Sequence, residues 1–310
     1  MDKTDFAYQS RDNIKIYGRR WMNYNVPIKG VVQIAHGMGE HIGRYEEFAK
    51  YLGNHGYIVY ANDHRGHGRT GELANQRGYF SDKHGWEKVV SDMAHLTNII
   101  RKNHPRVPVF LFGHSMGSLL SRDYIIRYSD RIKGVILSGT SGSLGIRGIL
   151  GQILVWLEMK IKGPKAPSPL MYKLSFEAFN DKFQPAKTHF DWLSRDEEEV
   201  DQYIKDPFCG GVFTTSFFND LIRGTRTINI QENINKVSKE LPIYIFSGEM
   251  DPVGNYSKGV QEVYNQFKKA GIKDVSIKIY ANGRHEMLNE INKYEVYKDI
   301  LNWIETHNKL

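Results

Sequence analysis

The pentapeptide Gly113-His114-Ser115-Met116-Gly117 constrains the fold of this chain more than any other feature. It follows an apolar run at residues 109–112 that predicts a buried strand, and a helical pattern occupies residues 118–128. A serine between a strand and a helix lies on a sharp, strained turn, and the two glycines allow the close backbone approach that this turn needs. The turn exposes the Ser115 hydroxyl and directs backbone N–H groups of the helix N-terminus toward it. We therefore predict that Ser115 is a nucleophile; a glycine-rich turn with a helix-capping serine is the alternative.

Strand and helix patterns alternate through both ends of the 310-residue chain. We expect strands at residues 5–10, 14–21, 31–35, 57–61, 109–112, 134–138, 243–247 and 275–280. We expect helices at residues 45–53, 86–104, 118–128, 256–270 and 293–307. Short continuous apolar runs are typical of strands covered on both faces, and the alternation predicts parallel crossover units. The first two strands should instead form an antiparallel hairpin, with a turn at residues 11–13.

The alternation stops between residue 138 and about residue 221. An apolar amphipathic run at residues 146–161 precedes a proline-rich segment at 163–169, and further helical patches follow. We interpret residues 140–221 as a helical cap inserted into an α/β core of residues 1–139 and 222–310. Such a cap would cover the carboxyl ends of the strands, where α/β proteins bind ligands. The run 146–161 either packs on the core or forms an apolar lip for transient membrane contact, and the sequence leaves both open.

The net charge and the cysteine content indicate which partners and which cellular compartment to expect for this chain. The net charge is +7 and the pI is about 9.2, but the basic residues form no dense block and match no nucleic-acid motif, so we expect no nucleic-acid partner. Cys209 is the only cysteine, which excludes an intrachain disulfide and fits a reducing compartment. The start resembles no signal peptide, and no apolar run is long enough to cross a bilayer. We expect a cytoplasmic protein, with peripheral membrane contact as the alternative.

A serine nucleophile needs a basic partner, and that base needs a carboxylate. In chains with this turn the acid comes after the serine and the histidine comes last. Asp251 lies on the loop after the strand at 243–247, with Glu249 as its nearest competitor. His285 lies on the loop after the last predicted strand, where a core role is hard to assign. We predict Asp251 and His285 as the partners of Ser115; for Asp251 the alternative is a turn aspartate before proline.

Two backbone N–H groups are needed to bind an oxyanion beside Ser115. One should come from Met116, directly after the serine, and the other from an early strand-to-helix loop. Met38 follows the strand at 31–35, and Gly37 and Gly39 on either side let its backbone face a pocket. We predict Met38 as the second donor; an ordinary turn is the alternative.

These motifs together resemble the monoacylglycerol lipase and lysophospholipase group of the α/β-hydrolase superfamily, also classed with serine aminopeptidases of the S33 type. The matching segments are H-G-M-G-E-H at 36–41, D-H-R-G-H-G at 63–68, G-H-S-M-G at 113–117, Asp251 and His285-Glu286, with a similar cap segment at 192–201. The resemblance implies an α/β-hydrolase fold: a mostly parallel eight-stranded sheet flanked by helices, with an inserted helical cap.

The resemblance also implies a function and a set of site residues. Ser115, Asp251 and His285 would form a catalytic triad, and the N–H groups of Met38 and Met116 the oxyanion hole. The supporting loop residues would be His36, Gly37, Gly39, His114 and Gly117. The implied reaction is hydrolysis of single-chain lipid esters, monoacylglycerol or lysophospholipid, through an acyl-enzyme. Animal members carry several cysteines around the glycerol end of the pocket, whereas Cys209 stands alone here. The glycerol preference therefore stays open, and small soluble esters or amides remain the alternative substrates.

Two further patterns point to other classes of protein. Residues 66–71 fit the G-x-G-x-x-G pattern of dinucleotide-binding proteins, but the polar, glycine-interrupted residues 72–79 do not predict the helix that this pattern requires. We therefore expect no cofactor. The histidines at 36, 41, 64 and 67 do not place two imidazoles on one helical face, as a zinc-hydrolase helix does, so we expect no metal.

Overall fold

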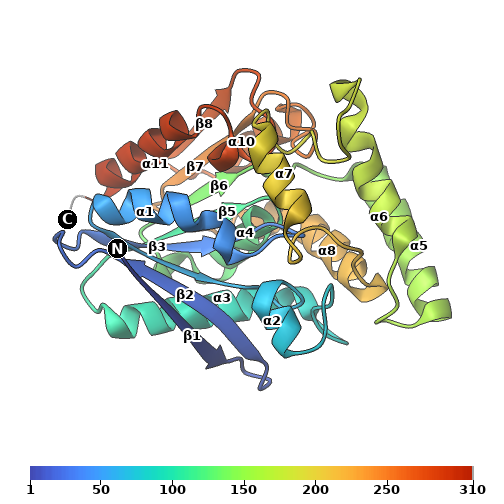
Figure 1. Cartoon of the computed structure of the whole chain (residues 1–310), viewed down its shortest axis with the longest axis horizontal. Coiled ribbons are helices and arrows are strands. Elements are labelled where there is room, and N and C mark those ends of the chain that lie inside the picture. Colours follow the sequence, from blue (N-terminus) through green and yellow to red (C-terminus); the bar gives the residue numbers. More distant parts are fainter. Residues whose placement is uncertain (309–310) are drawn as a thin grey trace.

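The computed structural model describes residues 1–308 and contains one eight-stranded sheet in the order β1-β2-β4-β3-β5-β6-β7-β8 (Figure 1). The strands are β1 (Asp2–Gln9), β2 (Lys15–Met22), β3 (Gly30–Ala35), β4 (Tyr57–Asn62), β5 (Val109–His114), β6 (Gly134–Ser138), β7 (Ile243–Gly248) and β8 (Val275–Tyr280). β2 is antiparallel to both of its neighbours, and every pair from β4 through β8 is parallel. The predicted α/β fold, its eight strands and its N-terminal hairpin are confirmed.

Helices cover both faces of this sheet, which explains why the central strands are apolar throughout. The helices of the regular α/β part are α1 (Glu46–Asn54), α3 (Gly85–Asn103), α4 (Met116–Tyr128), α10 (Lys258–Lys269) and α11 (Lys293–His307). One core cluster joins α1 and α11 to one face, and a second joins α3, α4 and α10 to the other. All residues of β3, β4, β5, β6 and β7 are buried. Burial on both faces is what short continuous apolar runs predict.

A short helix, α2 (Gly68–Leu73), begins where the sequence predicts none. Its start is stabilised by Asp63, whose Oδ2 accepts a hydrogen bond of 2.8 Å from the Arg69 N–H, while Oδ1 accepts one of 2.9 Å from the Ile42 N–H. Gly66 is required in this loop because a Cβ there would lie 2.5 Å from the Tyr79 nitrogen. Gly66 therefore serves a tight loop between β4 and α2. The expectation that residues 72–79 form no helix was wrong for Glu72 and Leu73, at which α2 ends.

A helical segment separates β6 from β7 and lies beyond one end of the sheet (Figure 1). Its helices are α5 (Gly145–Lys162), α6 (Pro169–Phe176), α7 (Glu197–Lys205), α8 (Thr215–Ile228) and α9 (Gln231–Ile234). The predicted cap boundary at residue 221 lies within α8. Arg223 of α8 donates two hydrogen bonds of 2.7 Å to Glu87 of α3, and Gly224 packs against the Trp86 ring, so this part of α8 contacts the core. The division into core and cap remains a prediction.

Within residues 1–308, no helix combines the length and the apolar character that crossing a bilayer requires.

Candidate active site

Ser115 lies between β5 and α4 with a backbone conformation that few non-glycine residues adopt. Its φ is 53° and its ψ is −122°, so the predicted strain at this turn is confirmed. Such conformations cost about 1–3 kcal/mol and persist only where the surroundings impose them. The Ser115 N–H donates to the Ser138 carbonyl at 2.9 Å, and the Ser115 carbonyl accepts from the Ser118 N–H at 2.8 Å. These bonds hold the turn to β6 on one side and to α4 on the other.

The two flanking glycines are needed for contact rather than for unusual dihedral angles. A Cβ on Gly117 would lie 2.0 Å from the Ala35 carbonyl oxygen at the end of β3. A Cβ on Gly113 would lie 2.4 Å from Ser121 Oγ and 2.5 Å from the Gly117 carbonyl oxygen. The serine turn is thus packed directly on the strand that leads into the Met38 loop, as the close approach predicted from the motif requires.

The structure brings Asp251 and His285 together. His285 Nδ1 and Asp251 Oδ1 are 2.9 Å apart, and 2% of His285 and 0% of Asp251 are exposed. Asp251 also accepts hydrogen bonds from Ser247 Oγ at 2.7 Å and from the Val253 N–H at 2.9 Å. A carboxylate held by three donors cannot rotate away, so it fixes the imidazole with Nδ1–H toward Asp251 and Nε2 free.

The electrostatic environment of this pair favours a charged imidazole. Burial lowers the pKa of His285, but the neighbouring Asp251 carboxylate outweighs it and raises that pKa above its ordinary value. Burial alone would raise the pKa of Asp251. His285 and the other groups that donate to the carboxylate outweigh burial, so this pKa lies below its ordinary value. The carboxylate therefore stays ionised and stabilises the proton that His285 would take from a hydroxyl. Among the described residues no direct hydrogen bond joins Ser115 to His285, although both line one cavity; such bonds are often long before substrate binds.

The Met38 and Met116 backbones flank Ser115 from two loops. Met116 begins α4, and Met38 lies on the loop after β3. Within residues 1–308, neither backbone N–H donates a hydrogen bond, so both are available to a ligand oxygen. Gly39 has a φ of 69°, and a Cβ on Gly37 would lie 3.1 Å from the Ser115 Cβ. The glycines therefore allow this loop to lie against Ser115.

Two histidines support the loops without taking part in the Asp251–His285 pair. Burial lowers the pKa of His36 to about 3, so its ring is neutral. Its Nε2 accepts from the His64 N–H at 2.9 Å, which leaves Nδ1–H to donate to the Gly37 carbonyl at 2.7 Å. Burial likewise lowers the pKa of His114 to about 4, and its ring centroid lies 4.8 Å from that of His285. His36 thus fixes the Met38 loop, and His114 packs against the candidate base.

A buried ionic network that the sequence does not reveal connects these loops. Arg44 donates to both carboxylate oxygens of Glu286, at 2.6 and 2.7 Å, and to Glu40 at 3.3 Å. Glu40 in turn accepts from the Gly37 N–H and from the Tyr45 hydroxyl. Arg44 therefore links the Met38 loop to the residue next to His285. Glu40 and Glu286 stand in recognisable motifs, but nothing in the pattern marks Arg44 as their common partner.

One cavity of about 780 Å³ contains Ser115, His285 and the Met38 loop. Its floor comes from the loops at the carboxyl ends of β3, β5 and β8, and its walls come from the helical segment. The apolar wall residues include Leu150, Leu154, Tyr172, Phe176, Phe179, Trp192 and Ile222. The strands β3 and β5 are adjacent, but the loops that follow them lead to helices on opposite faces of the sheet. Open α/β sheets bind ligands at such a point.

This sheet, with a strained serine after its fifth strand and a paired acid and histidine after later strands, defines an α/β-hydrolase. Residues 26–292 match the family described as serine aminopeptidase, S33, and the chain belongs to that family. It is a hydrolase of the group that includes the monoacylglycerol lipases.

Individual relatives support this placement. The chain is 29% identical to a monoacylglycerol lipase of Mycolicibacterium smegmatis over 98% of each chain. It is 26% identical to the Homo sapiens monoglyceride lipase over 94% of this chain and 88% of the other. The crystal structure of a thermostable carboxyl esterase from Bacillus coagulans in complex with glycerol superposes with a TM-score of 0.91, at 29% identity and full coverage of both chains.

Proposed function

We propose that this enzyme is a serine hydrolase that cleaves carboxylic esters of single-chain lipids, monoacylglycerol first and lysophospholipid second. The observation that carries this proposal is the buried Asp251–His285 pair, which shares one largely apolar cavity with Ser115. A base, an acid that orients it and a strained serine are the parts that acyl transfer requires.

The reaction begins when His285 Nε2 takes the proton of the Ser115 hydroxyl. The oxygen attacks the ester carbonyl, and Asp251 stabilises the resulting imidazolium. The N–H groups of Met38 and Met116 bind the oxyanion of the tetrahedral intermediate, an effect worth roughly 3 kcal/mol per donor. His285 then protonates the leaving alcohol, and an acyl-enzyme on Ser115 remains. Water, deprotonated by the same histidine, releases the fatty acid and restores the serine.

The size and lining of the cavity support a substrate with one acyl chain. Its volume of about 780 Å³ lies within the range of roughly 300–1,000 Å³ that encloses a single drug-sized ligand. Aliphatic and aromatic side chains of α5, α6 and the segment after them line the walls, and Glu40, His114 and His285 are among the polar residues that share the cavity with Ser115. An ester placed at Ser115 would direct its chain along this apolar wall and its alcohol toward the polar end.

Fatty-acid release tests the proposal most directly. Monoacylglycerol and lysophosphatidylcholine of equal chain length are offered to the wild type, to Ser115→Ala and to Ser141→Ala. Ser141 also lines the cavity and makes no side-chain hydrogen bond within residues 1–308, so it is the matched control. We expect release by the wild type and by Ser141→Ala, and none by Ser115→Ala, together with fluorophosphonate labelling only where Ser115 is present. Unchanged release by a folded Ser115→Ala variant would contradict the mechanism.

The similarity to the Bacillus coagulans carboxyl esterase favours a second candidate, an esterase for small soluble esters. The catalytic steps would be the same, and only the occupant of the apolar wall would differ. Rates with p-nitrophenyl esters of increasing acyl length separate the two. A rate that rises with chain length supports the lipid substrate, and one that falls from the shortest ester supports the soluble one.

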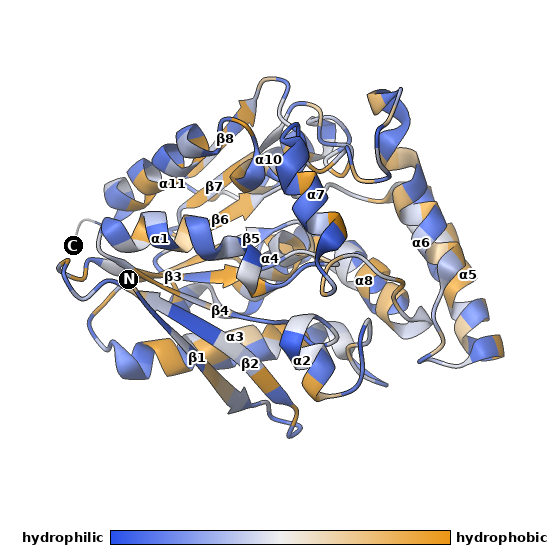
Figure 2. Ribbon diagram, viewed as in Figure 1, coloured by the Kyte–Doolittle hydropathy of each residue, from blue (hydrophilic) through white to orange (hydrophobic). Residues whose placement is uncertain are grey.

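We also propose that α5 makes transient contact with a lipid surface. Large apolar side chains that do not line the cavity are exposed along α5: Ile146 at 75%, Ile153 at 52%, Leu157 at 45% and Ile161 at 82%. Figure 2 shows apolar residues along both α5 and α6 at this end of the molecule. Basic residues lie on the same helix, where they can meet anionic head groups.

Sedimentation with anionic phospholipid vesicles tests this contact. The substitution Ile153→Glu should weaken vesicle binding and leave the hydrolysis of a soluble ester unchanged. Ile28→Glu, at a comparably exposed apolar residue (43%) outside the helical segment, is the control and should bind as the wild type does. Equal binding by all three proteins would refute a role for α5.

A further inference from the structure

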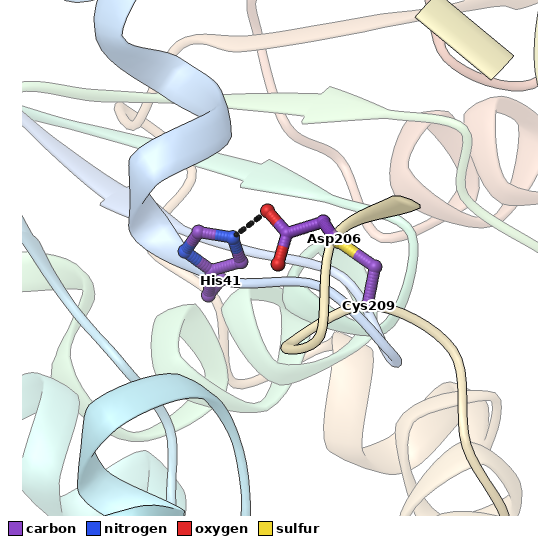
Figure 3. Close-up of side chains that lie close together, drawn as sticks. All are labelled: His41, Asp206 and Cys209. Atoms are coloured by element: carbon purple, nitrogen blue, oxygen red, sulfur yellow. Dashed lines mark hydrogen bonds and ion pairs between the residues drawn. The ribbon is translucent and has the colours of Figure 1, made fainter. Parts of the chain in front are cut away.

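Three side chains with metal-binding atoms meet beside the Met38 loop (Figure 3). His41 follows β3 in the core, whereas Asp206 and Cys209 belong to the turn after α7. Their ligand atoms all lie within 4.8 Å of one another. Each residue is half-buried, and 17% of the His41 side chain and 29% of the Asp206 side chain remain exposed, so an ion can reach them from solvent.

The turn that carries two of these residues is internally ordered. The Cys209 N–H donates to the Asp206 carbonyl at 3.0 Å, and the Phe208 N–H donates to Asp206 Oδ1 at 2.8 Å. Asp206 therefore holds its second oxygen, Oδ2, toward His41, whose Nε2 lies 2.8 Å away (Figure 3). The local backbone positions the carboxylate and the thiol in a fixed relation to each other.

We propose that His41, Asp206 and Cys209 form a binding site for a zinc ion. An imidazole nitrogen, a carboxylate oxygen and a thiolate sulfur form a donor set that Zn²⁺ accepts, whereas Ca²⁺ and Mg²⁺ take oxygen ligands. Three protein ligands leave a fourth position for water. From the sequence no metal is expected, because the histidines share no helical face; the partners of His41 are instead an aspartate and a cysteine far along the chain.

Binding of zinc changes the protonation of two ligands, Cys209 and His41. The Cys209 thiol loses its proton to solvent and ligates as thiolate. In the metal-free protein, His41 Nδ1 accepts the Gly43 N–H at 3.2 Å, so a neutral ring carries its proton on Nε2 and donates it to Asp206. Zinc on Nε2 moves that proton to Nδ1 and displaces the Gly43 bond. Loss of the Gly43 hydrogen bond lowers the affinity of the site for zinc. A lowered affinity is typical of a reversibly bound ion rather than a structural one.

An ion at this position joins the helical segment to the Met38 loop. None of the three ligands lines the cavity, but Gly39 and Gly210 do, and the Gly210 N–H donates to the Gly39 carbonyl at 2.8 Å. Gly39 is next to Met38, which carries the oxyanion donor of the function proposed above. If that function holds, the bound ion changes kcat more than KM, because it acts on the loop that contacts the transition state.

A cobalt titration tests the site without relying on catalysis. Co²⁺ is added to the wild type, Cys209→Ser, His41→Ala and His189→Ala, the last being the control because His189 is an exposed histidine of the same helical segment. We expect one Co²⁺ per wild-type chain with a thiolate-to-cobalt charge-transfer band that Zn²⁺ abolishes by displacement. Cys209 is the only cysteine, so the band has no other source in the chain.

The variants decide the outcome. The band should vanish in Cys209→Ser, binding should weaken roughly tenfold or more in His41→Ala, and His189→Ala should match the wild type. Absence of the band in the wild type, or equal affinity in all four proteins, overturns the site. If the thermal unfolding of a metal-free variant differs from that of the wild type, Asp206→Asn is titrated in place of that variant. The same titration with Ser115→Ala keeps the metal result separate from the outcome of the ester assays.

Discussion

Replacing Arg44 by methionine leaves two buried carboxylates without their shared cation. The side chains of Arg44, Glu40 and Glu286 are exposed by 10%, 4% and 5%. Burial raises the pKa of Glu286, but Arg44 outweighs it and brings the pKa from its ordinary 4.5 to about 2. A pKa difference of that size corresponds to about 3 kcal/mol of stability. Measured losses on breaking buried ion pairs, about 3–5 kcal/mol, agree with it.

The sign of this contribution sets its dependence on pH. Because the pKa of Glu286 is depressed, its stabilisation is complete above about pH 4.5 and is lost as the pH falls toward about 2. In Arg44→Met the unpaired Glu286 carboxyl takes up a proton at a higher pH, which removes its penalty. The difference in unfolding free energy between wild type and variant should therefore exceed about 3 kcal/mol at neutral pH, because burial also raises the pKa of the unpaired carboxyl, and it should shrink as the pH falls.

Urea unfolding of both proteins from pH 7 down to about pH 4 measures this difference. The control is Arg147→Met, because Arg147 is exposed at the mouth of the cavity and its replacement should change stability by less than about 0.5 kcal/mol. A loss below about 1 kcal/mol in Arg44→Met, or a loss of equal size at both ends of the pH range, would refute the role assigned to this ion pair.

Three further predictions follow from the site. Since Asp251 raises the pKa of His285, the acid limb of kcat/KM should lie above the ordinary histidine value of about 6.5; a limb below that value contradicts the pairing. Asp251→Asn should move that limb downward, because His285 then loses the carboxylate that opposes burial most, and should reduce kcat roughly 10⁴-fold; a loss of activity with an unmoved limb would indicate lost packing rather than lost charge. Gly117→Ala should cost about 1–3 kcal/mol in urea unfolding and most of the activity, because its Cβ would lie 2.0 Å from the Ala35 oxygen, whereas Gly151→Ala, with its nearest neighbour at 3.5 Å, should be neutral or slightly stabilising.

The architecture and the catalytic candidates were accessible from sequence because each depends on local pattern and order along the chain. Continuous apolar runs predict strands covered on both faces, and each candidate catalytic residue directly follows such a run. Ser115, Asp251 and His285 could therefore be placed at one edge of the sheet before their contacts were known. The structure adds the 2.9 Å bond between Asp251 and His285, and it shows that the N–H groups of Met38 and Met116 find no acceptor among residues 1–308.

Contacts between distant segments could not be predicted in the same way. Arg44 reads as an ordinary basic residue near the start of a helix, and its partner Glu286 lies 242 residues later. The same holds for His41 and Asp206, which lie 165 residues apart. Periodicity also predicts α5 without showing whether its apolar side packs on the core or faces outward. The docking of the helical segment, and with it the shape of the cavity, depends on such long-range packing.

The order of the site residues along the chain also determines when the enzyme becomes active during its synthesis. The ribosome makes Met38, Arg44 and Ser115 early, and the strained serine turn contacts β3, β6 and α4, which all precede the helical segment. The acid and the histidine follow β7 and β8, after the entire helical segment has been translated. If Ser115 and His285 act as proposed, the nucleophile is therefore made before its base, and the pair is incomplete until residue 285 has been translated.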